Sequence, residues 1–543
     1  MSTVQEIAAE FRAKGYWGDA TICDYFAFAR KARPDQLAYK DRRGSSLTFR
    51  ELDQRSAAIA GWLKEAGVSA GDIVSVQIPN WVEFAEVFVA CMKLGAVINP
   101  LATNLRVRDL EFIFSRCRTV AAFFPSSFRS NSYVSTAQSL LESQDSLRVV
   151  GVVEPDVGGG AVDGTGSLVG FEAIENFPRP LPVHEEYRGV GSVPAAVIFT
   201  SGSEATPKGV LLSHNNLAAV CQMFMQTVGF GWDDRMFMAA PLGHATGFFF
   251  GIVMGVVGRV SSVLCDSTDP VEMVDFMEAT ACTGTMGVPT LVDYLLKDAL
   301  IRHVPLARMR FVACGGAPMP RALVRRAQEF GVRLVSVYGA TECAPIVMSR
   351  GDEMLTQLWQ SDGRVCDGVH VKIVDPCTKE EVPSGDVGEL VALSPSGFLG
   401  YLGEPEMTAA SRDPLGWFYS GDLARAGAQG RIEIVGRIKD TIIRGGENIS
   451  VREIEDLVAE VDCVEDVAVA GVEDALLGQR TCAVVVLRPG CHLTVADLRE
   501  HFVRGGVAKY KIPEYLIEVE EIPRLASGKV DRMSIRRMCS SAV

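Results

Sequence analysis

Length, composition and charge narrow the classes of protein to which this chain can belong. The 543 residues are too many for one ordinary hydrophobic core, so we expect a large domain of several subdomains, or several domains. The chain is 48% hydrophobic and 22% charged, and its net charge of −14 is spread along it without a Lys/Arg block. This composition excludes a disordered protein and argues against nucleic acid as a partner.

The N-terminus, the most apolar segment and the cysteines indicate where the protein resides. Residues 1–7 lack the basic start and apolar stretch of a secretory signal. The segment from Phe248 to Val257 is about half as long as a bilayer span, so we expect a buried helix there. None of the 14 cysteines forms a C-x-x-C pair, and many lie in apolar runs, which indicates reduced, buried thiols. We predict a cytoplasmic protein without a transmembrane segment.

The first two-thirds of the chain alternates short apolar runs with amphipathic stretches, a pattern typical of a parallel sheet flanked by helices. One strand–helix–strand unit is predicted from residues 73–78 through 81–94 to 96–98. A second runs from residue 283 through 289–300 to 309–313, and a third ends at residues 334–338. Residues 158–170 are rich in glycine, which favours a surface loop. The expected class is therefore α/β, with right-handed crossings.

The pattern changes after about Gly436 to a compact α+β block of roughly one hundred residues, a size that can fold alone. Ser450 and Glu453 have the spacing of a capping box, so a helix should begin there. Strands are predicted at residues 466–472 and 483–487. We therefore divide the chain into an N-terminal domain, residues 1–436, and a C-terminal domain, residues 437–543.

The strongest local motif is a loop of small residues after the apolar run 195–199. It reads Thr200-Ser201-Gly202-Ser203-Glu204-Ala205-Thr206-Pro207-Lys208-Gly209. Polyphosphate binding needs such residues, because glycine lets backbone N–H groups approach the oxygens, hydroxyls add donors and Lys208 supplies positive charge. The spacing is not that of the P-loop of nucleotide hydrolases. If the segment stood alone, a polar surface hairpin would be the alternative.

Six further motifs follow the loop: Pro241-Leu-Gly-His244, Gly315-Gly316-Ala317-Pro318, Tyr338-Gly339-Ala340-Thr341-Glu342, Tyr419-Ser-Gly-Asp422, Gly436-Arg437-Ile-Lys439-Asp440 and Pro523-Arg-Leu-Ala-Ser-Gly-Lys529. All seven motifs in this order resemble the adenylate-forming superfamily of acyl-CoA synthetases, carrier-protein adenylation domains and beetle luciferases. The resemblance covers essentially the whole chain. Residues 15–19 and 241–247 are most similar to bacterial short- and medium-chain acyl-CoA synthetases and cyclohexanecarboxylate-CoA ligases.

The resemblance implies a fold and a nucleotide site. The fold is a large N-terminal domain of βαβ-type subdomains with a β-barrel-like part, and a small, mobile α+β C-terminal domain whose hinge lies near residues 437–440. Glu342 and Thr200 would hold Mg²⁺, Thr341 would lie near the α-phosphate, and Asp422 and Arg437 would bind the ribose. Other contacts with ATP would come from Ser201, Gly202, Ser203, Lys208, Gly315, Gly316, Ala317, Tyr338 and Gly339.

Taken singly, these residues have plainer interpretations. An acidic residue that ends a loop, such as Glu342, is usually solvated. Asp422, in Ser-Gly-Asp, would more often be a turn residue, and Tyr338 a core residue. Gly315 and Gly316 follow an apolar run, as in an ordinary strand-to-helix turn. The order of the motifs, and not any one residue, supports the nucleotide site.

Lys529 is the predicted catalytic lysine of the first step. An anionic carboxylate must attack an anionic α-phosphate, so positive charge and alignment matter more than proton transfer. Without the motif, a lysine this close to the C-terminus would be read as part of a solvated tail. The resemblance places His244 between the acyl pocket and the thiol tunnel, as a gate or a pocket wall; a satisfied core histidine is the alternative.

The second step would use another face of the small domain. The thiol of coenzyme A attacks an anhydride that is already activated, so the protein must guide the thiol and exclude water. The resemblance implies a rotation about Lys439 that brings in residues 444–448, where Gly445 and Gly446 would let the pantetheine arm pass. By itself, a Gly-Gly pair is only a turn.

The predicted activity is that of an AMP-forming acyl-CoA ligase, with ATP, Mg²⁺ and coenzyme A. A carboxylic acid and ATP give acyl-AMP and pyrophosphate, and coenzyme A then gives acyl-CoA and AMP. The expected acyl pocket is lined from Phe248, Phe249 and residues 288–289, 316–317 and 340–341. Because it lacks Arg and Lys, we expect an uncharged, apolar acyl group, of short or medium length or alicyclic.

Several alternatives stay open at this point. The chain could load a carrier protein, act as a luciferase-like oxidase, or bind an acyl nucleotide without catalysis. Glu204 and Ala205 stand where the superfamily usually has Thr-Gly, a change that could reshape pyrophosphate handling. A homodimer is compatible with the sequence.

Overall fold

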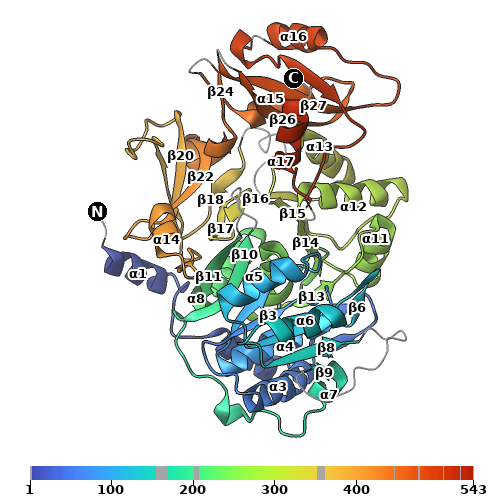
Figure 1. Cartoon of the computed structure of the whole chain (residues 1–543), viewed down its shortest axis with the longest axis vertical. Helices are drawn as coiled ribbons and strands as arrows, with labels where there is room; N and C mark the ends of the chain where they lie inside the picture. The colour runs from blue at the N-terminus through green and yellow to red at the C-terminus, as the bar shows by residue number, and fades with distance from the viewer. Residues whose placement is uncertain are drawn as a thin grey trace. The chain divides into compact units, whose positions relative to one another are not determined.

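The structure is a computed structural model that describes residues 3–154, 168–200, 207–350, 361–444, 447–474, 477–505, 507–525 and 528–541. The chain forms two compact units. The first contains Met1–Trp359, Gly363–His370 and Ala392–Phe418, and the second contains Gln360–Asp362, Val371–Val391 and Tyr419–Val543. Figure 1 shows the elements of both units. The domain boundary at residues 436 and 437 stays a prediction.

The first unit contains an eight-stranded sheet. Its order is β21 (Gly400–Tyr401), β11 (Lys208–Ser213), β10 (Pro194–Thr200), β4 (Val97–Pro100), β3 (Ile73–Val76), β5 (Ala121–Pro125), β8 (Val149–Val153) and β9 (Leu168–Gly170). Strands β3 and β4 are parallel and joined by α4 (Val82–Leu94), which confirms the first predicted unit. Helices α5 (Val107–Cys117) and α6 (Val134–Ser143) pack apolar side chains on this sheet.

The expected surface loop at residues 158–170 is only partly described. Residues 158–167 lie outside the described residues. Leu168–Gly170 form β9 and pair in parallel with β8, so the loop prediction is wrong for these three residues. Glycine at one end did not prevent pairing, because the strand adds to an existing sheet edge.

The first unit also contributes strands to a second sheet, in the order β18 (Gly363–Val365), β17 (Cys343–Met348), β16 (Leu334–Ala340), β15 (Phe311–Gly315), β14 (Gly284–Gly287), β12 (Arg235–Met238), β13 (Ser261–Leu264), β1 (Leu37–Asp41) and β2 (Ser46–Thr48). Helices α11 (Pro270–Ala279), α12 (Pro289–Ile301) and α13 (Arg321–Phe330) pack on it through a shared apolar core. The run β14–α12–β15 and strand β16 confirm the other two predicted units.

The predicted buried helix is present. Residues Phe248–Val253 form the π-helix η2, and α10 (Met254–Val257) continues it, with every residue buried. Among the described residues, no helix combines the length and apolarity needed to cross a bilayer. The remaining helices of this unit are α1 (Val4–Ala13), α2 (Ile22–Ala32), α3 (Phe49–Glu65), α7 (Phe171–Glu175), η1 (Val183–Glu185), α8 (His214–Val228), α9 (Ala245–Gly247) and α14 (Pro405–Ser411).

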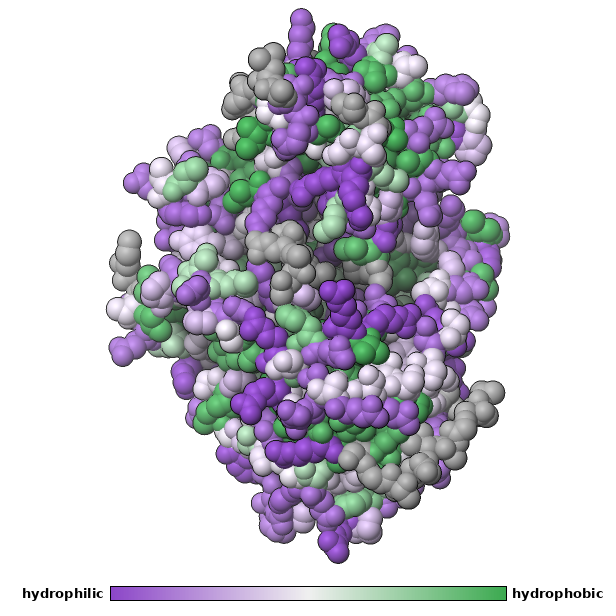
Figure 2. All heavy atoms as spheres, in the orientation of Figure 1, coloured by the Kyte–Doolittle hydropathy of each residue, from purple (hydrophilic) through white to green (hydrophobic). Residues whose placement is uncertain are grey.

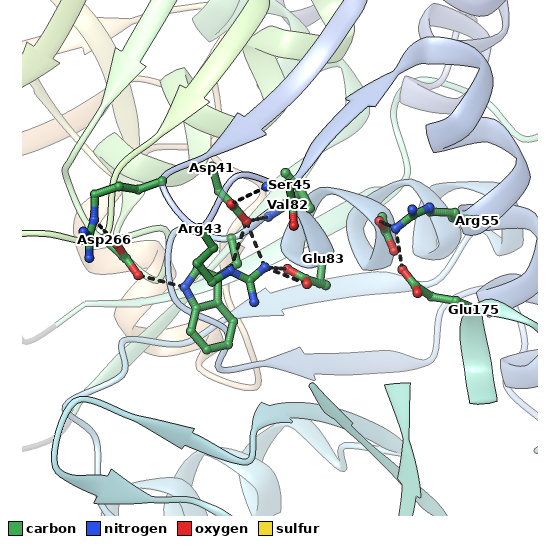
Figure 3. Close-up of polar contacts among 11 residues, drawn as sticks. Asp41, Arg43, Ser45, Arg55, Val82, Glu83, Glu175 and Asp266 are labelled. Atoms are coloured by element: carbon green, nitrogen blue, oxygen red, sulfur yellow. Dashed lines mark hydrogen bonds and ion pairs between the residues drawn. The ribbon is translucent and has the colours of Figure 1, made fainter. Parts of the chain in front are cut away.

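Polar contacts of two arginines tie α4 to its neighbours (Figure 3). Arg43 Nη2 donates to Asp41 Oδ2 at 2.8 Å and to Glu83 Oε1 at 2.6 Å. Arg55 Nη1 donates to Glu175 Oε1 at 2.9 Å and to the fully buried Glu86 at 3.3 Å. Burial, together with the neighbouring Glu175 carboxylate, raises the pKa of Glu86 well above its usual value.

The second unit contains strands of two sheets. Strands β19 (His370–Val374), β20 (Val387–Leu393), β22 (Phe418–Ala426) and β23 (Arg431–Arg437) lie mostly within it and follow one another in one sheet. The other sheet has the order β25 (Glu447–Ile449), β24 (Ile442–Arg444), β27 (Gly478–Leu487) and β26 (Val464–Asp474), and β28 (Tyr515–Glu518) pairs with β27. Its helical segments are η4 (Ala428–Gly430), η5 (Ile438–Asp440), α15 (Val451–Ala459), α16 (Val495–Arg504), η6 (Lys509–Lys511) and α17 (Arg532–Ser541).

The first helix of the C-terminal part begins as predicted, but its cap is one-sided. Ser450 Oγ accepts a hydrogen bond from Glu453 N–H, so Ser450 is the N-cap of α15. The Glu453 carboxylate instead accepts from Lys511 Nζ at 2.6 Å. The two predicted strands are confirmed as parts of β26 and β27, which are longer than expected.

The α/β class is confirmed, with one correction to the predicted shape of its sheets. Every sheet of described strands has two open ends, so the part expected to be barrel-like does not form a closed barrel. All 14 cysteines are free, and most are buried, as the sequence predicted. Hydrophilic side chains cover much of the face seen in Figure 2, with hydrophobic ones scattered among them.

Candidate active site

The predicted phosphate loop joins two antiparallel strands of the first unit. Thr200 ends β10 and Lys208 begins β11, and these two residues pair in the ladder. Both are half-buried at the mouth of the hairpin. Ser201, Gly202 and Ser203 lie outside the described residues, as do the departures Glu204 and Ala205. The structure therefore places the two ends of the loop side by side.

Strand β21 brings an unpredicted tyrosine to the same place. Val210 pairs with Tyr401, and Leu402 N–H donates to Gly209 O at 2.8 Å. The Lys208 ammonium group lies 5.6 Å from the centroid of the Tyr401 ring, within reach of a cation–π attraction. Tyr401 thus shares the mouth of the hairpin with Lys208.

Glu342 is held at both its backbone and its carboxylate. Tyr401 Oη donates to Glu342 Oε1 at 2.8 Å, and Phe398 N–H donates to Glu342 O at 2.8 Å. The rings of Phe398 and Tyr401 meet edge to face, 5.0 Å apart. Sequence reasoning missed both aromatic residues, because their contacts with Glu342 join segments that lie more than fifty residues apart in the sequence.

The residues predicted to contact adenine lie at the carboxyl ends of two neighbouring parallel strands. Gly315 ends β15 and pairs with Val337 of β16, and Tyr338 and Gly339 follow in β16. A Cβ at Gly315 would lie 2.4 Å from Val337 O. Gly316 has φ of +81°. Backbone packing alone therefore requires glycine at both positions.

Ala317 and Thr341 border the same region of the first unit. Ala317 is exposed just beyond β15, and Thr341 is half-buried in the turn between β16 and β17, directly before Glu342. In open α/β sheets, ligands bind outside the carboxyl ends of the strands. The arrangement suits a nucleotide, although the contacts of each residue with ATP stay a prediction.

His244 lies in a tightly packed loop of the first unit. Its N–H donates to Pro241 O, its carbonyl accepts from Phe248 N–H, and it is the N-cap of the short helix α9, which leads into the buried helix. A Cβ at Gly247 would lie 2.2 Å from Pro241 O, which leaves no room for a larger residue. His244 is half-buried. Its role as a gate stays a prediction.

Asp422 and Arg437 face each other across β22 and β23 in the second unit. The two residues pair in the ladder, and Arg437 Nε donates to Asp422 Oδ1 at 3.0 Å. Asp422 is buried, and Arg437 is exposed. Glu389, which the sequence did not single out, accepts from Gly421 N–H at 3.1 Å and pairs with Lys379 at 2.7 Å. The turn before Asp422 is therefore fixed.

The predicted hinge and catalytic lysine also lie in the second unit. Lys439 is exposed in η5, and its carbonyl and the Asp440 carboxylate both accept from Arg536 of α17. Lys529 is exposed, and its carbonyl accepts from Leu525 N–H at 2.8 Å in a short turn. Gly445 and Gly446 lie outside the described residues.

Two family models match the chain: AMP-binding enzyme over residues 26–402, and AMP-binding enzyme C-terminal domain over residues 453–529. The chain belongs to the AMP-binding enzyme family. It is 36% identical over 534 residues to the medium-chain fatty-acid–CoA ligase of Escherichia coli (strain K12), which covers 97% of this chain and 92% of the relative. It is 32% identical to the feruloyl-CoA synthase of an Amycolatopsis species, over 94% of this chain and 97% of that protein.

Solved structures share the fold of this AMP-binding enzyme. ATP-bound MatB from Rhodopseudomonas palustris superposes with a TM-score of 0.84 and 27% identity, over 96% of this chain and 99% of MatB. An anthranilate CoA ligase, AuaEII, in complex with anthranoyl-AMP gives a TM-score of 0.86 at 22% identity, over 96% and 98% of the two chains. The predicted class, with a large N-terminal and a small C-terminal domain, is confirmed. The chain is an AMP-forming acyl-CoA ligase that uses ATP and coenzyme A.

Magnesium fits the residues of this AMP-binding enzyme only as a partner of bound phosphate. The described residues contain no cluster of three or more His, Cys, Asp or Glu side chains able to hold a metal ion. Mg²⁺ usually keeps several waters and is bound through one or two carboxylates plus substrate phosphates. Glu342, with one carboxylate oxygen held by Tyr401, would be such a carboxylate, and Thr200 would add a hydroxyl group.

Proposed function

We propose that this acyl-CoA ligase activates an apolar monocarboxylic acid, of short or medium chain length or with an alicyclic ring. The observation that carries the proposal is the 36% identity to a medium-chain fatty-acid–CoA ligase over 97% of the chain. The expected pocket supports it, because Phe248 and Phe249 lie in a wholly buried helix and the expected lining has no cationic side chain to pair a second carboxylate.

Residues of the first unit hold the polyphosphate and the metal in this proposal. Mg²⁺, when bound, neutralises phosphate charge as the acid attacks. Glu342 and Thr200 would hold it, and Tyr401 fixes the Glu342 carboxylate at 2.8 Å in advance. Lys208 places positive charge at the mouth of the phosphate hairpin. Thr341, next to Glu342, is positioned to donate its hydroxyl to the α-phosphate.

The base and the sugar of ATP have separate proposed contacts. Gly315, Gly316 and Ala317 leave the ends of β15 and β16 open to a flat base beside Tyr338. Asp422 accepts from the ribose hydroxyls, and Arg437 orients the Asp422 carboxylate through its 3.0 Å hydrogen bond. Gly339 takes part through its backbone, since a Cβ there would lie 2.9 Å from Cys343 O.

The two reaction steps need different residues of the second unit. Lys529 supplies the positive charge that stabilises the pentavalent phosphorus centre as the acyl carboxylate displaces pyrophosphate. Thioester formation needs a passage for the thiol, to which Gly445 and Gly446 are assigned. The hinge between the two arrangements is Lys439, within a C-terminal domain that begins at residue 437. His244 closes the acyl pocket toward the thiol.

We also propose that the protein is cytoplasmic and that its cysteines are reduced. Support comes from the 14 free cysteines, because stable disulfides are rare in the reducing cytosol. A homodimer stays a prediction.

The substrate proposal is tested by ATP–pyrophosphate exchange with a panel of acids in the presence of Mg²⁺. We expect exchange with linear acids of short to medium length and with cyclohexanecarboxylate. A dicarboxylic acid of matched length serves as the control. It should support pyrophosphate exchange at a rate at least tenfold lower, because its second charge would be buried without a partner. Faster exchange with the dicarboxylic acid would contradict the proposal.

A further inference from the structure

Several hydrogen bonds that involve side chains fasten the N-terminal segment at residues 15–19 to the interior of the first unit, among them one from Tyr16 Oη to Asp367 O at 3.1 Å. Tyr16 Oη donates to Gln226 Oε1 at 3.0 Å. Gly18 N–H donates to Asn215 Oδ1 at 3.1 Å. Between them, Trp17 Nε1 donates to Pro395 O at 2.8 Å. Of these bonds, the one from Trp17 reaches the segment that follows residue 392.

The Pro395 carbonyl receives a second donor. Asn216 Nδ2, which is buried at the start of α8, donates to it at 3.0 Å. The Trp17 ring packs edge to face on Phe11 at 4.9 Å and joins a small apolar cluster with Leu393. Two hydrogen bonds and this packing therefore fix the chain at residues 393–395 from one side.

The same turn reaches Glu342 on its other side. Ser394 and Ser396 share a hydrogen bond of 2.8 Å between their hydroxyl oxygens, which closes the turn after Pro395. Phe398, three residues after Pro395, donates its N–H to Glu342 O at 2.8 Å. Tyr401, three residues further along, donates its hydroxyl to the Glu342 carboxylate. One short segment thus connects Trp17 to both hydrogen bonds that hold Glu342.

We propose that Trp17 is a positioning residue for the metal-binding carboxylate of Glu342, acting through Pro395, Phe398 and Tyr401. The proposal rests on the proposed role of Glu342 as a Mg²⁺ ligand. Mg²⁺ demands near-ideal octahedral geometry, so a small displacement of one carboxylate oxygen weakens binding. Removing the Trp17 N–H leaves Pro395 O with one donor and loosens the segment that carries Phe398 and Tyr401.

The expected effect is on the metal and not on the nucleotide alone. Losing one hydrogen bond between neutral groups should weaken metal binding by about threefold to tenfold. Affinity for ATP measured in EDTA should stay the same, because Trp17 contacts none of the residues assigned to the base or the ribose. A purely structural role for Trp17 would lower the melting temperature without separating these two affinities.

The test uses the full-length chain with Trp17→Phe, which removes the N–H and keeps an aromatic ring. Mn²⁺ serves as the probe, and its binding in the presence of a non-hydrolysable ATP analogue is measured by electron paramagnetic resonance. Tyr16→Phe is the matched control, since it removes the hydrogen bonds of the same segment to Gln226 and Asp367 and leaves the one from Trp17 to Pro395 in place. A third variant, Glu342→Gln, tests whether Glu342 binds the metal at all.

We expect weaker Mn²⁺ binding for Trp17→Phe and wild-type binding for Tyr16→Phe. If Glu342→Gln weakens Mn²⁺ binding while Trp17→Phe does not, the inference about Trp17 is wrong and the role of Glu342 stands. If Glu342→Gln leaves Mn²⁺ binding unchanged, the proposed metal site itself is wrong. Should Trp17→Phe fail to fold, Trp17→benzothienylalanine keeps the bicyclic shape and replaces only the N–H by sulfur, and the same outcomes apply.

Discussion

Tyr401 donates a hydrogen bond of 2.8 Å to Glu342 Oε1, and its ring lies 5.6 Å from the Lys208 ammonium group. One side chain therefore contacts both the proposed metal ligand and the lysine of the phosphate hairpin. The contact arises because β21 pairs with β11, the strand that follows the phosphate loop. The Lys208 ammonium group and the Glu342 carboxylate therefore both lie beside the Tyr401 side chain.

Removing the Tyr401 hydroxyl should raise the Mg²⁺ concentration needed for adenylate formation. In Tyr401→Phe the charged Glu342 carboxylate loses the hydrogen bond that the Tyr401 hydroxyl donates to it, and a hydrogen bond to a charged group contributes about 1.5–3 kcal/mol. We expect a roughly tenfold higher half-saturating Mg²⁺ concentration in pyrophosphate exchange, with rates near those of the wild type at saturation. An unchanged Mg²⁺ dependence would show that Tyr401 does not position Glu342.

Neutralising Asp422 should weaken ATP binding strongly. Asp422→Asn removes a charged acceptor and leaves Arg437 without its carboxylate partner, so we expect the Kd for ATP to rise about tenfold to a hundredfold. Isothermal titration calorimetry measures this Kd directly. Asp375→Asn is the control, because the Asp375 carboxylate caps an exposed turn in the same unit. Similar Kd values for both variants would remove Asp422 from the ribose site.

Lys529 and Gly446 should separate the two half-reactions. Lys529→Ala should nearly abolish adenylate formation, by more than a hundredfold, and still convert supplied acyl-adenylate and coenzyme A into thioester. Gly446→Trp should spare adenylation and impair thioester formation. Stopped-flow release of pyrophosphate and chromatographic detection of the thioester measure the two steps. Equal loss of both steps in Lys529→Ala would contradict the division of labour.

Glu86 should make the free energy of unfolding depend on pH. Its folded-state pKa is raised above the ordinary value of 4.5, so the folded protein binds the proton more tightly than the unfolded chain. The contribution of this proton to the free energy of unfolding is complete below pH 4.5 and is lost as the pH rises through the folded-state pKa of Glu86. Glu86→Gln, which mimics the protonated form, should melt at a higher temperature than the wild type at pH 8 and show a shallower fall in melting temperature between pH 5 and 8.

Calorimetry over that pH range makes the comparison, with Glu175→Gln as a second variant. Replacing Glu175 removes the neighbouring charge that raises the Glu86 pKa, so its curve should lie between the other two. Parallel curves for wild type and Glu86→Gln would mean that Glu86 is not the group responsible.

The sequence predicted the parts of the fold that depend on periodicity. The unit from β3 through α4 to β4 combines apolar strands with an apolar helix that is capped after Leu94 by Gly95, which has φ of +70°. The cap of α15 was only half right, because Lys511, 58 residues away, competes for the Glu453 carboxylate. The strand Leu168–Gly170 was missed because it gains its stability from pairing with β8 and not from its own residues.

Candidate site residues could be predicted from the sequence only where they belong to a local motif. Thr200, Lys208, Gly315, Tyr338 and Glu342 could be predicted as site residues because each belongs to a motif with a recognisable order. Tyr401, Phe398, Glu389 and Trp17 were missed because their roles depend on hydrogen bonds across long stretches of chain. The pairing of β21 with β11 and the hydrogen bond from Trp17 to Pro395 join segments far apart in the sequence, and no local pattern predicts either contact.

Release of AMP and acyl thioester from ATP, Mg²⁺ and octanoate, measured with and without coenzyme A, tests the central claim most directly. The account predicts turnover that requires coenzyme A and yields one AMP for each acyl-CoA formed. Adenylate that accumulates with coenzyme A present, and is discharged only onto a phosphopantetheinylated carrier protein, would contradict it.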